Sequence, residues 1–122
     1  MMNIILSALS HTWILDLDGT IVKHNGYKNK GEDSLLPGVK NFFDSIPATD
    51  MVVLITSRKI EYKELTEQFL TENNIRYDHI IYDAPYGERI LINDNKPSGL
   101  EMAKSICLDR DAGMDFEVKL DL

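Results

Sequence analysis

The sequence predicts an α/β domain with a mostly parallel sheet, and two observations lead to this fold class. Short apolar runs of strand length alternate along the chain with segments whose apolar residues recur at helical spacing. Polar residues suited to ligand binding come directly after three of these runs. Strands separated by helices pair in parallel through right-handed crossovers, so we expect these polar residues at one edge of the sheet.

The composition is that of one ordinary globular domain. The chain has 122 residues, of which 43% are hydrophobic and 27% charged, enough for one core but not for a second sizeable module. The formal net charge of −7 disfavours nucleic acid and anionic membranes as partners. The single cysteine, Cys107, lies in an apolar stretch where we expect a buried thiol, and it indicates a cytoplasmic location.

The first third of the chain contains the clearest strand. Residues 1–10 are apolar but too short to cross a bilayer, and we expect them to pack on the domain as a helical turn or a strand. The run Trp13-Ile14-Leu15 predicts a strand buried on both faces, which Gly19 ends. The polar segment 20–36 is expected to form a hairpin or flap. Its basic and aromatic residues are candidates for contacting a leaving group, with a solvated hairpin as the equal alternative: Lys23, His24, Tyr27 and Lys28.

The remaining elements follow in order. Pro37 suits the first turn of a helix that ends before Pro47, and the run 51–55 is a second buried strand. The pattern then predicts a helix over about 59–72, short strands over 79–82 and 89–92, and a last helix over 100–106. The tail, about 109–122, is predicted either as an edge strand over 116–120 or as a loosely held segment.

Asp16 and Asp18 end the first buried strand one residue apart. Two carboxylates so close repel each other, and a hard divalent cation such as Mg²⁺ relieves the repulsion through oxygen ligands. Asp16 is therefore a candidate nucleophile of the kind that forms an aspartyl-phosphate, and Asp18 is a candidate proton donor and acceptor. A strand followed by an acidic turn is the structural alternative.

Residues 16–20, Asp-Leu-Asp-Gly-Thr, resemble the first motif of the haloacid dehalogenase (HAD) superfamily of phosphohydrolases. The resemblance implies a Rossmann-like three-layer sandwich and Mg²⁺-dependent hydrolysis of a phosphate monoester through a phospho-aspartate on Asp16. It also implies that Asp18 protonates the leaving oxygen and then activates water. The spacings between the motifs leave no room for a sizeable cap domain, so residues 1–122 are predicted to form one HAD-like phosphatase domain of the capless type.

The second motif of the superfamily has a counterpart at the end of the run 51–55. Leu54-Ile55-Thr56-Ser57 resembles it, which implies that Thr56 and Ser57 bind the phosphoryl oxygens. A hydroxyl beside backbone amides at a strand-to-helix turn suits an anion. Either residue can instead cap the following helix, and the two roles are compatible.

The fourth motif has a counterpart in Leu91-Ile92-Asn93-Asp94. The resemblance implies that Asp94 is a metal ligand together with Asp16 and the backbone carbonyl of Asp18. The superfamily commonly has two carboxylates here, whereas this chain has Asn93 in place of one of them. A neutral amide oxygen is expected to lower the metal affinity or to act through water.

The third motif, a cation that binds the phosphate, is the least certain. Lys96 follows Asp94 closely and is the favoured candidate for phosphate binding. Arg89 is less favoured as this cation, because it would begin its predicted strand at the end opposite the expected site. Lys63 is less favoured because it is expected on a solvated helix face. Arg58, directly after the second motif, is a candidate for contacting the substrate.

The resemblance to capless members implies either a large or exposed phosphate as substrate or a neighbouring subunit that acts as a lid. The acidic charge balance disfavours nucleic acid, so a small phosphorylated metabolite or sugar phosphate with a homo-oligomer is the favoured expectation. Two alternatives of other classes stay open. A receiver-like phospho-acceptor domain has a similar length, but it requires an adjacent acidic pair after its first strand, whereas Leu17 separates the two aspartates here. A catalytically impaired phosphate-binding domain is suggested by Asn93 and the uncertain cation, although Asp18 argues against it.

Overall fold

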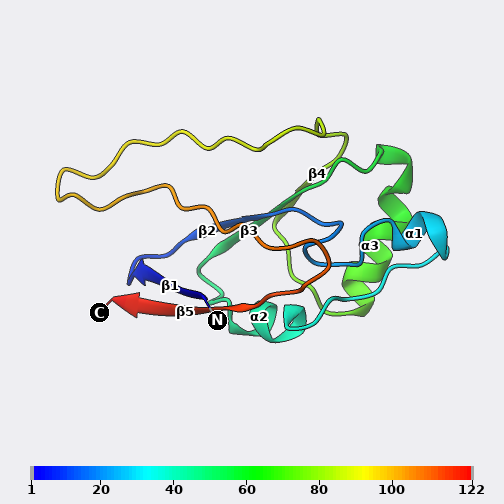
Figure 1. Ribbon diagram of the computed structural model, residues 1–122, viewed down its shortest axis with the longest axis horizontal. Coiled ribbons are helices and arrows are strands. Elements are labelled where there is room, and N and C mark those ends of the chain that lie inside the picture. Colours follow the sequence, from blue (N-terminus) through cyan, green and yellow to red (C-terminus); the bar gives the residue numbers. More distant parts are fainter. Residues whose placement is uncertain (1, 122) are drawn as a thin grey trace.

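A computed structural model describes residues 2–121 and has an α/β fold with two parallel sheets (Figure 1). The larger sheet has the order β2-β3-β4, formed by β2 (Thr12–Leu15), β3 (Met51–Ile55) and β4 (His79–Ile81). The smaller sheet pairs β1 (Met2–Ser7) with β5 (Phe116–Asp121). The predicted parallel pairing of the first three internal strands is therefore confirmed.

The helices lie in the connections between these strands. They are α1 (Gly26–Asn29), α2 (Val39–Ser45), the short 3₁₀ helix η1 (Ile60–Tyr62) and α3 (Lys63–Glu72). The two helices predicted between 37 and 72 are present as α2 and as η1 with α3. The flap, residues 20–36, contains α1 and joins the end of β2 through bridges from Val22 to Asp18 and to Leu35.

One face of the larger sheet carries the core. Val52 and Leu54 of β3 are fully buried, and they pack in one cluster with residues of α2 and α3 such as Val39 and Leu70. The opposite face is only partly covered, because Ile14 of β2 and Ile81 of β4 are each 49% exposed. The expectation that the strand at Ile14 is buried on both faces is wrong, since the side chains of a strand alternate between faces and both of these longer helices pack on one side.

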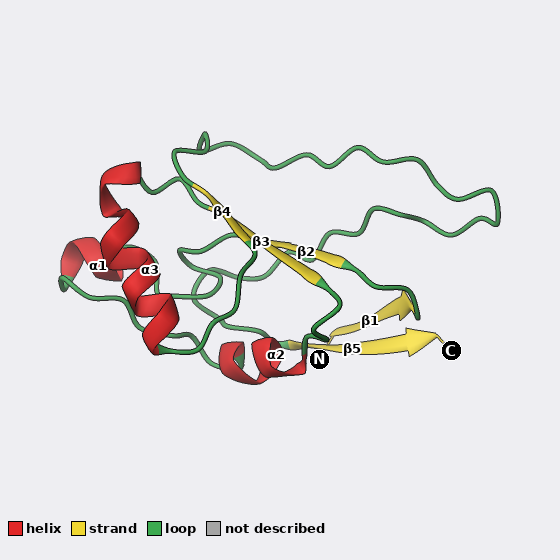
Figure 2. Ribbon diagram, turned by 180° about the vertical axis from the view of Figure 1, so that it is seen from behind, coloured by secondary structure: helices red, strands yellow, loops and turns green. Residues whose placement is uncertain are grey.

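The two ends of the described chain lie side by side. Both uncertain expectations resolve to strands, with the apolar start forming β1 and the tail forming β5. Figure 2 shows this small sheet next to α2, where the rings of Phe42 and Phe116 are 5.5 Å apart.

Buried Asp50 fixes the start of β2, because its carboxylate accepts hydrogen bonds from the Trp13 indole (2.9 Å) and the His11 amide (3.0 Å).

Residues 84–108, here called the excursion, run out from the domain and back without any helix or strand (Figure 1). The predictions of a strand over 89–92 and a helix over 100–106 are therefore wrong. A four-residue apolar run becomes a strand only where another strand accepts its hydrogen bonds. In the part of the chain described, the hydrogen bonds found for residues 90–108 join residues of that same segment, such as the Lys96 amide to the Leu100 carbonyl.

The excursion also changes the environment of Cys107, which is exposed rather than buried because the helix expected around it does not form. Across residues 2–121, we find no helix with the length and apolar character needed to cross a membrane.

Candidate active site

The carboxyl end of β2 carries both predicted carboxylates. The Asp16 side chain is 39% exposed, whereas that of Asp18 is 16% exposed. Leu17 between them is buried, and its carbonyl accepts the amides of the following turn. Gly19 in this turn has a φ of +84°, and a Cβ there would lie 3.1 Å from Cγ of Arg110. The turn therefore requires glycine, and it leaves Asp16 open to solvent while Asp18 faces inward.

Asp18 is held by Arg58, which follows β3. The Arg58 Nε donates to Oδ2 of Asp18 at 3.0 Å and its Nη2 to Oδ1 at 2.9 Å. The same guanidinium donates to both oxygens of Asp33 in the flap and lies 3.9 Å from the centre of the Tyr27 ring. The side chains of Arg58 and Asp33 are 0% and 2% exposed. Together Asp18, Asp33 and Arg58 form a buried ion cluster, here called the Arg58 cluster.

This environment fixes the charge of Arg58. Burial disfavours the charged form, but hydrogen bonds and charge attraction from Asp18 and Asp33 outweigh it, so the pKa of Arg58 lies above its usual value. Arg58 is therefore a permanent cation that ties the flap to the end of β2. The interpretation of Arg58 as a substrate contact is wrong, because its donors are occupied within the domain.

Of the two residues after β3 that are predicted to bind phosphate, Ser57 reaches the surface of the site and Thr56 does not. The Thr56 side chain is buried, and its hydroxyl oxygen accepts the Arg58 amide at 3.0 Å. This contact shapes the turn after β3. It is not the helix cap that the alternative expected, because η1 begins after Lys59 without a side-chain cap. The Ser57 hydroxyl is half-buried and donates to the Pro85 carbonyl at 3.4 Å.

Arg89 joins the ends of β2 and β3. Its Nη1 lies 3.3 Å from Oδ1 of Asp16, and its Nη2 donates to the Ser57 hydroxyl at 3.4 Å. Sequence reasoning set Arg89 aside because it would begin a strand at the wrong end. Since residues 89–92 form no strand, that objection does not hold, and Arg89 is the candidate cation that the structure brings to Asp16.

The other predicted residues lie elsewhere. Asp94 and Asn93 are exposed in the excursion, and Lys96 forms the turn with Leu100 at its far end (Figure 1). Lys63 begins α3 with an exposed side chain, as its solvated alternative predicted. Within residues 2–121, no three Asp, Glu, His or Cys side chains are grouped so that they could hold a metal ion. The set expected for Mg²⁺, with Asp94 joining the two aspartates after β2, is therefore not assembled.

Sequence reasoning missed a contribution from the C-terminal segment. Asp111 accepts a hydrogen bond from the His24 amide at 2.8 Å, and its own amide donates to the Gly19 carbonyl at 2.9 Å. The neighbouring Arg110 packs against Gly19. Asp111 thus links the turn after β2 to the flap. It lies 87 residues from His24 in a polar stretch without periodicity, so no local signal could have identified it.

Parallel strands with polar groups gathered at their carboxyl ends define an α/β protein of the Rossmann-like kind. No known protein family and no curated protein matches this chain. Among solved structures, it is similar to a chain in "Structure of Pnkp1/Rnl/Hen1 complex", with 28% sequence identity and a TM-score of 0.53. The likeness covers 68% of this chain and 31% of that one, so the chain spans about a third of that chain's length.

Proposed function

We propose that this chain hydrolyses a phosphate monoester of a small metabolite or sugar through a phospho-aspartate on Asp16. The observation that supports this proposal is the contact of one guanidinium, Arg89, with both Asp16 after β2 and Ser57 after β3. An exposed carboxylate, a hydroxyl and a cation thus meet at the edge where parallel sheets bind ligands. The resemblance of residues 16–20 and 54–57 to HAD motifs points to the same reaction.

In the proposed reaction, an oxygen of Asp16 attacks phosphorus and the ester oxygen leaves with a proton. Arg89 and the Ser57 hydroxyl bind the phosphoryl oxygens, which neutralises charge and fixes the line of attack. Water then attacks phosphorus, loses a proton, and breaks the bond to Asp16, which restores the carboxylate and releases phosphate.

Asp18 is the proposed proton donor, and its position sets a condition on that role. Both of its oxygens accept hydrogen bonds from Arg58. One of them must give up this hydrogen bond and take up a proton from solvent before Asp18 can protonate the leaving oxygen. Arg58 can release that one bond without losing its charge pairing, because Asp33 holds it independently.

Mg²⁺ belongs to the proposal through the resemblance, but the residues as arranged do not fit it. Asp16 pairs with Arg89, and Asp94 lies in the excursion rather than beside Asp16. We therefore derive no step through a metal. A three-layer HAD-like fold with Asp94 as a ligand requires residues 89–92 to pair with the free edge of β2 and residues 100–106 to form a helix on the partly open face. That pairing would carry Arg89 away from Asp16, since four strand residues span roughly 13 Å.

The test is phosphate release from a panel of phosphate esters, measured with added Mg²⁺ and again with a chelator. Asp16→Asn should lower release at least ~10³-fold, because an amide cannot form the acyl phosphate. Asp121→Asn, which changes an exposed aspartate of β5, is the matched control and should keep full activity. Activity that survives Asp16→Asn would show that the nucleophile is a different group.

The same panel separates the metal-bound arrangement from the one described. Release that needs Mg²⁺ and is lost in Asp94→Asn would show that the excursion folds back onto β2. Release that persists with the chelator and in Asp94→Asn would show that Arg89 serves without a metal.

A second candidate is a phosphate-binding domain without catalysis, and the pairing of both Asp18 oxygens with Arg58 favours it. It predicts that inorganic phosphate shifts the amide resonances near Ser57 while no ester of the panel is hydrolysed.

A further inference from the structure

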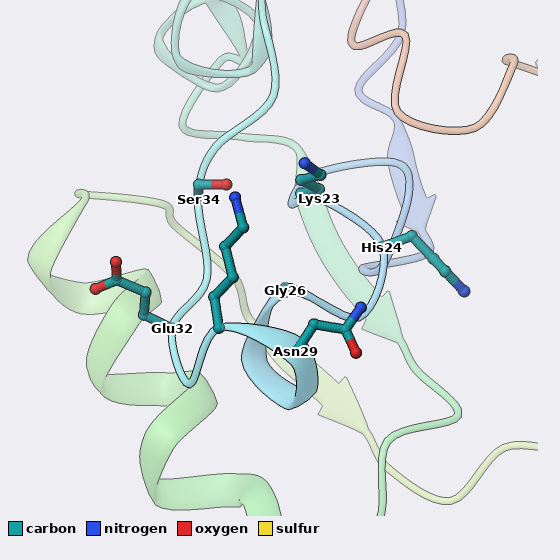
Figure 3. Close-up of a pocket in the computed structure, with 7 residues that line it drawn as sticks. Lys23, His24, Gly26, Asn29, Glu32 and Ser34 are labelled. Carbon is teal, nitrogen blue, oxygen red and sulfur yellow. The ribbon is translucent and has the colours of Figure 1, made fainter.

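The flap contains a cavity that the proposed reaction does not use. It has a volume of about 210 Å³, and Figure 3 shows it between Lys23 on one side and Ser34 on the other, with Asn29 of α1 beside them. The residues that line it all come from this one segment: Lys23, His24, Gly26, Asn29, Lys30, Glu32 and Ser34.

The lining is rich in hydrogen-bond donors and positive charge. Within residues 2–121, neither Lys23 nor Lys30 forms an ion pair with a carboxylate. Figure 3 shows the Ser34 hydroxyl turned toward the side of Lys23, whereas the carboxylate of Glu32 points away from the cavity. Since the chain as a whole has a net charge of −7, two unneutralised lysines at one cavity form a local exception.

The walls of the cavity are fixed rather than loosely connected. The Lys23 amide donates to the Ser34 carbonyl at 3.0 Å, which joins the two sides. Gly26 is buried between them, and a Cβ there would lie 3.1 Å from the Glu32 carbonyl oxygen. Asp33, next to Ser34, belongs to the Arg58 cluster and thereby connects this wall to Asp18.

We propose that this cavity binds a small oxyanion, a phosphate or carboxylate group, through Lys23, Lys30 and Ser34. Ammonium and hydroxyl donors satisfy oxyanions, and two lysines supply the opposite charge. The volume is below the roughly 300–1,000 Å³ of sites for drug-sized ligands, so it suits a group of a few atoms.

Binding is tested by titrating the intact chain with inorganic phosphate and following amide resonances by NMR, with sodium chloride at equal ionic strength as the reference. The amides of residues 23–34 should shift and saturate. In the double variant Lys23→Gln/Lys30→Gln, the apparent Kd from these amides should rise at least ~10-fold, because charge-assisted hydrogen bonds are lost.

Lys28→Gln is the matched control. Lys28 lies in the same helix as Asn29 but does not line the cavity, and its ammonium lies 5.7 Å from the Tyr27 ring centre. The control should keep the Kd of the unchanged chain. Equal weakening by Lys28→Gln, or saturation that survives the double variant, would overturn the oxyanion site. Unchanged resonances of the core strands β2 and β3 show that each variant is folded.

The oxyanion site and the proposed hydrolysis fail separately, because loss of esterase activity in Asp16→Asn leaves the phosphate titration at residues 23–34 unaffected.

Discussion

The rim of the candidate site and the excursion differ in how their polar and apolar groups are satisfied. At the rim, Arg58 is fully buried and donates to two carboxylates from different segments. In the excursion, Ile90 and Ile92 are 82% and 90% exposed. The part of the expected site around Asp16 is thus held by hydrogen bonds and ion pairs between distant segments. Residues 90–108, which carry Asp94, form no hydrogen bond to another segment in the described chain.

Residues that follow an apolar run can form a site only when tertiary contacts hold that run in the sheet as a strand. Asp16 and Ser57 follow strands that are paired in the sheet, and they meet at Arg89. Asp94 follows an apolar run of the same character that has no partner strand, and it remains apart from them. The variants below test this difference by changing residues at the rim and in the excursion.

The largest effect on stability is expected at the Arg58 cluster. Arg58→Leu leaves Asp18 and the buried Asp33 without a cation, and it should lower the free energy of unfolding by ~3–5 kcal/mol. Urea unfolding followed by circular dichroism measures this change. Arg76→Leu is the control, because its side chain is 39% exposed and it should cost less than ~1 kcal/mol. Equal costs for the two variants would show that the Arg58 cluster stabilises the domain no more than an exposed ion pair does.

The next effect concerns the cation at the rim. Arg89→Gln removes the charge beside Asp16 and should lower kcat/KM for a phosphate ester ~10–100-fold, the loss of ~1.5–3 kcal/mol expected for a charge-assisted hydrogen bond. Lys96→Gln at the far end of the excursion is the matched control and should leave kcat/KM unchanged. If Lys96→Gln shows the larger loss, the excursion folds back and the original choice of cation is correct.

A smaller effect is expected where the excursion begins. Tyr82 and Tyr77 donate to the two oxygens of Glu67 in α3, at 3.0 and 3.2 Å. Burial, followed by interactions with Glu67, raises the pKa of both phenols. Because these phenols bind their protons more tightly in the folded state than in the unfolded chain, their contribution to stability is constant below pH ~10 and is lost as the pH rises above it.

Tyr82→Phe removes one of these titrations. Its unfolding free energy should fall less steeply above pH ~10, by up to ~1.4 kcal/mol per pH unit. Urea unfolding at pH 8, 9, 10 and 11 gives the slope, and Tyr86→Phe, which changes an exposed tyrosine of the excursion, should keep that of the unchanged chain. Identical slopes for Tyr82→Phe and Tyr86→Phe would contradict a role for Glu67 in anchoring Tyr82.

Much of the fold could be predicted because its signals are local. Apolar runs and helical periodicity identified β2, β3, α2 and α3. The strand ends predicted that Asp16, Thr56 and Asp94 meet at one rim. In the structure Asp16 and Ser57 contact Arg89, whereas Thr56 is buried and Asp94 lies in the excursion. The Arg58 cluster could not be predicted, because it joins residues 25 and 40 positions away from Arg58. The strand at 89–92 was overpredicted because hydrophobicity measures suitability for burial, and pairing depends on a partner that no local pattern reveals.

The smallest effect is expected from a charge placed in the excursion. Ile92→Asp should change the unfolding free energy by less than ~0.5 kcal/mol, because the side chain is 90% exposed and loses no packing. Leu54→Asp, in the buried face of β3, is the contrasting variant and should prevent folding, since an unpaired carboxylate would enter the core. Urea unfolding of Ile92→Asp and of the unchanged chain measures this difference in unfolding free energy. A loss of several kcal/mol would mean that Ile92 packs against β2 in solution, and the separation between the rim and the excursion would then disappear.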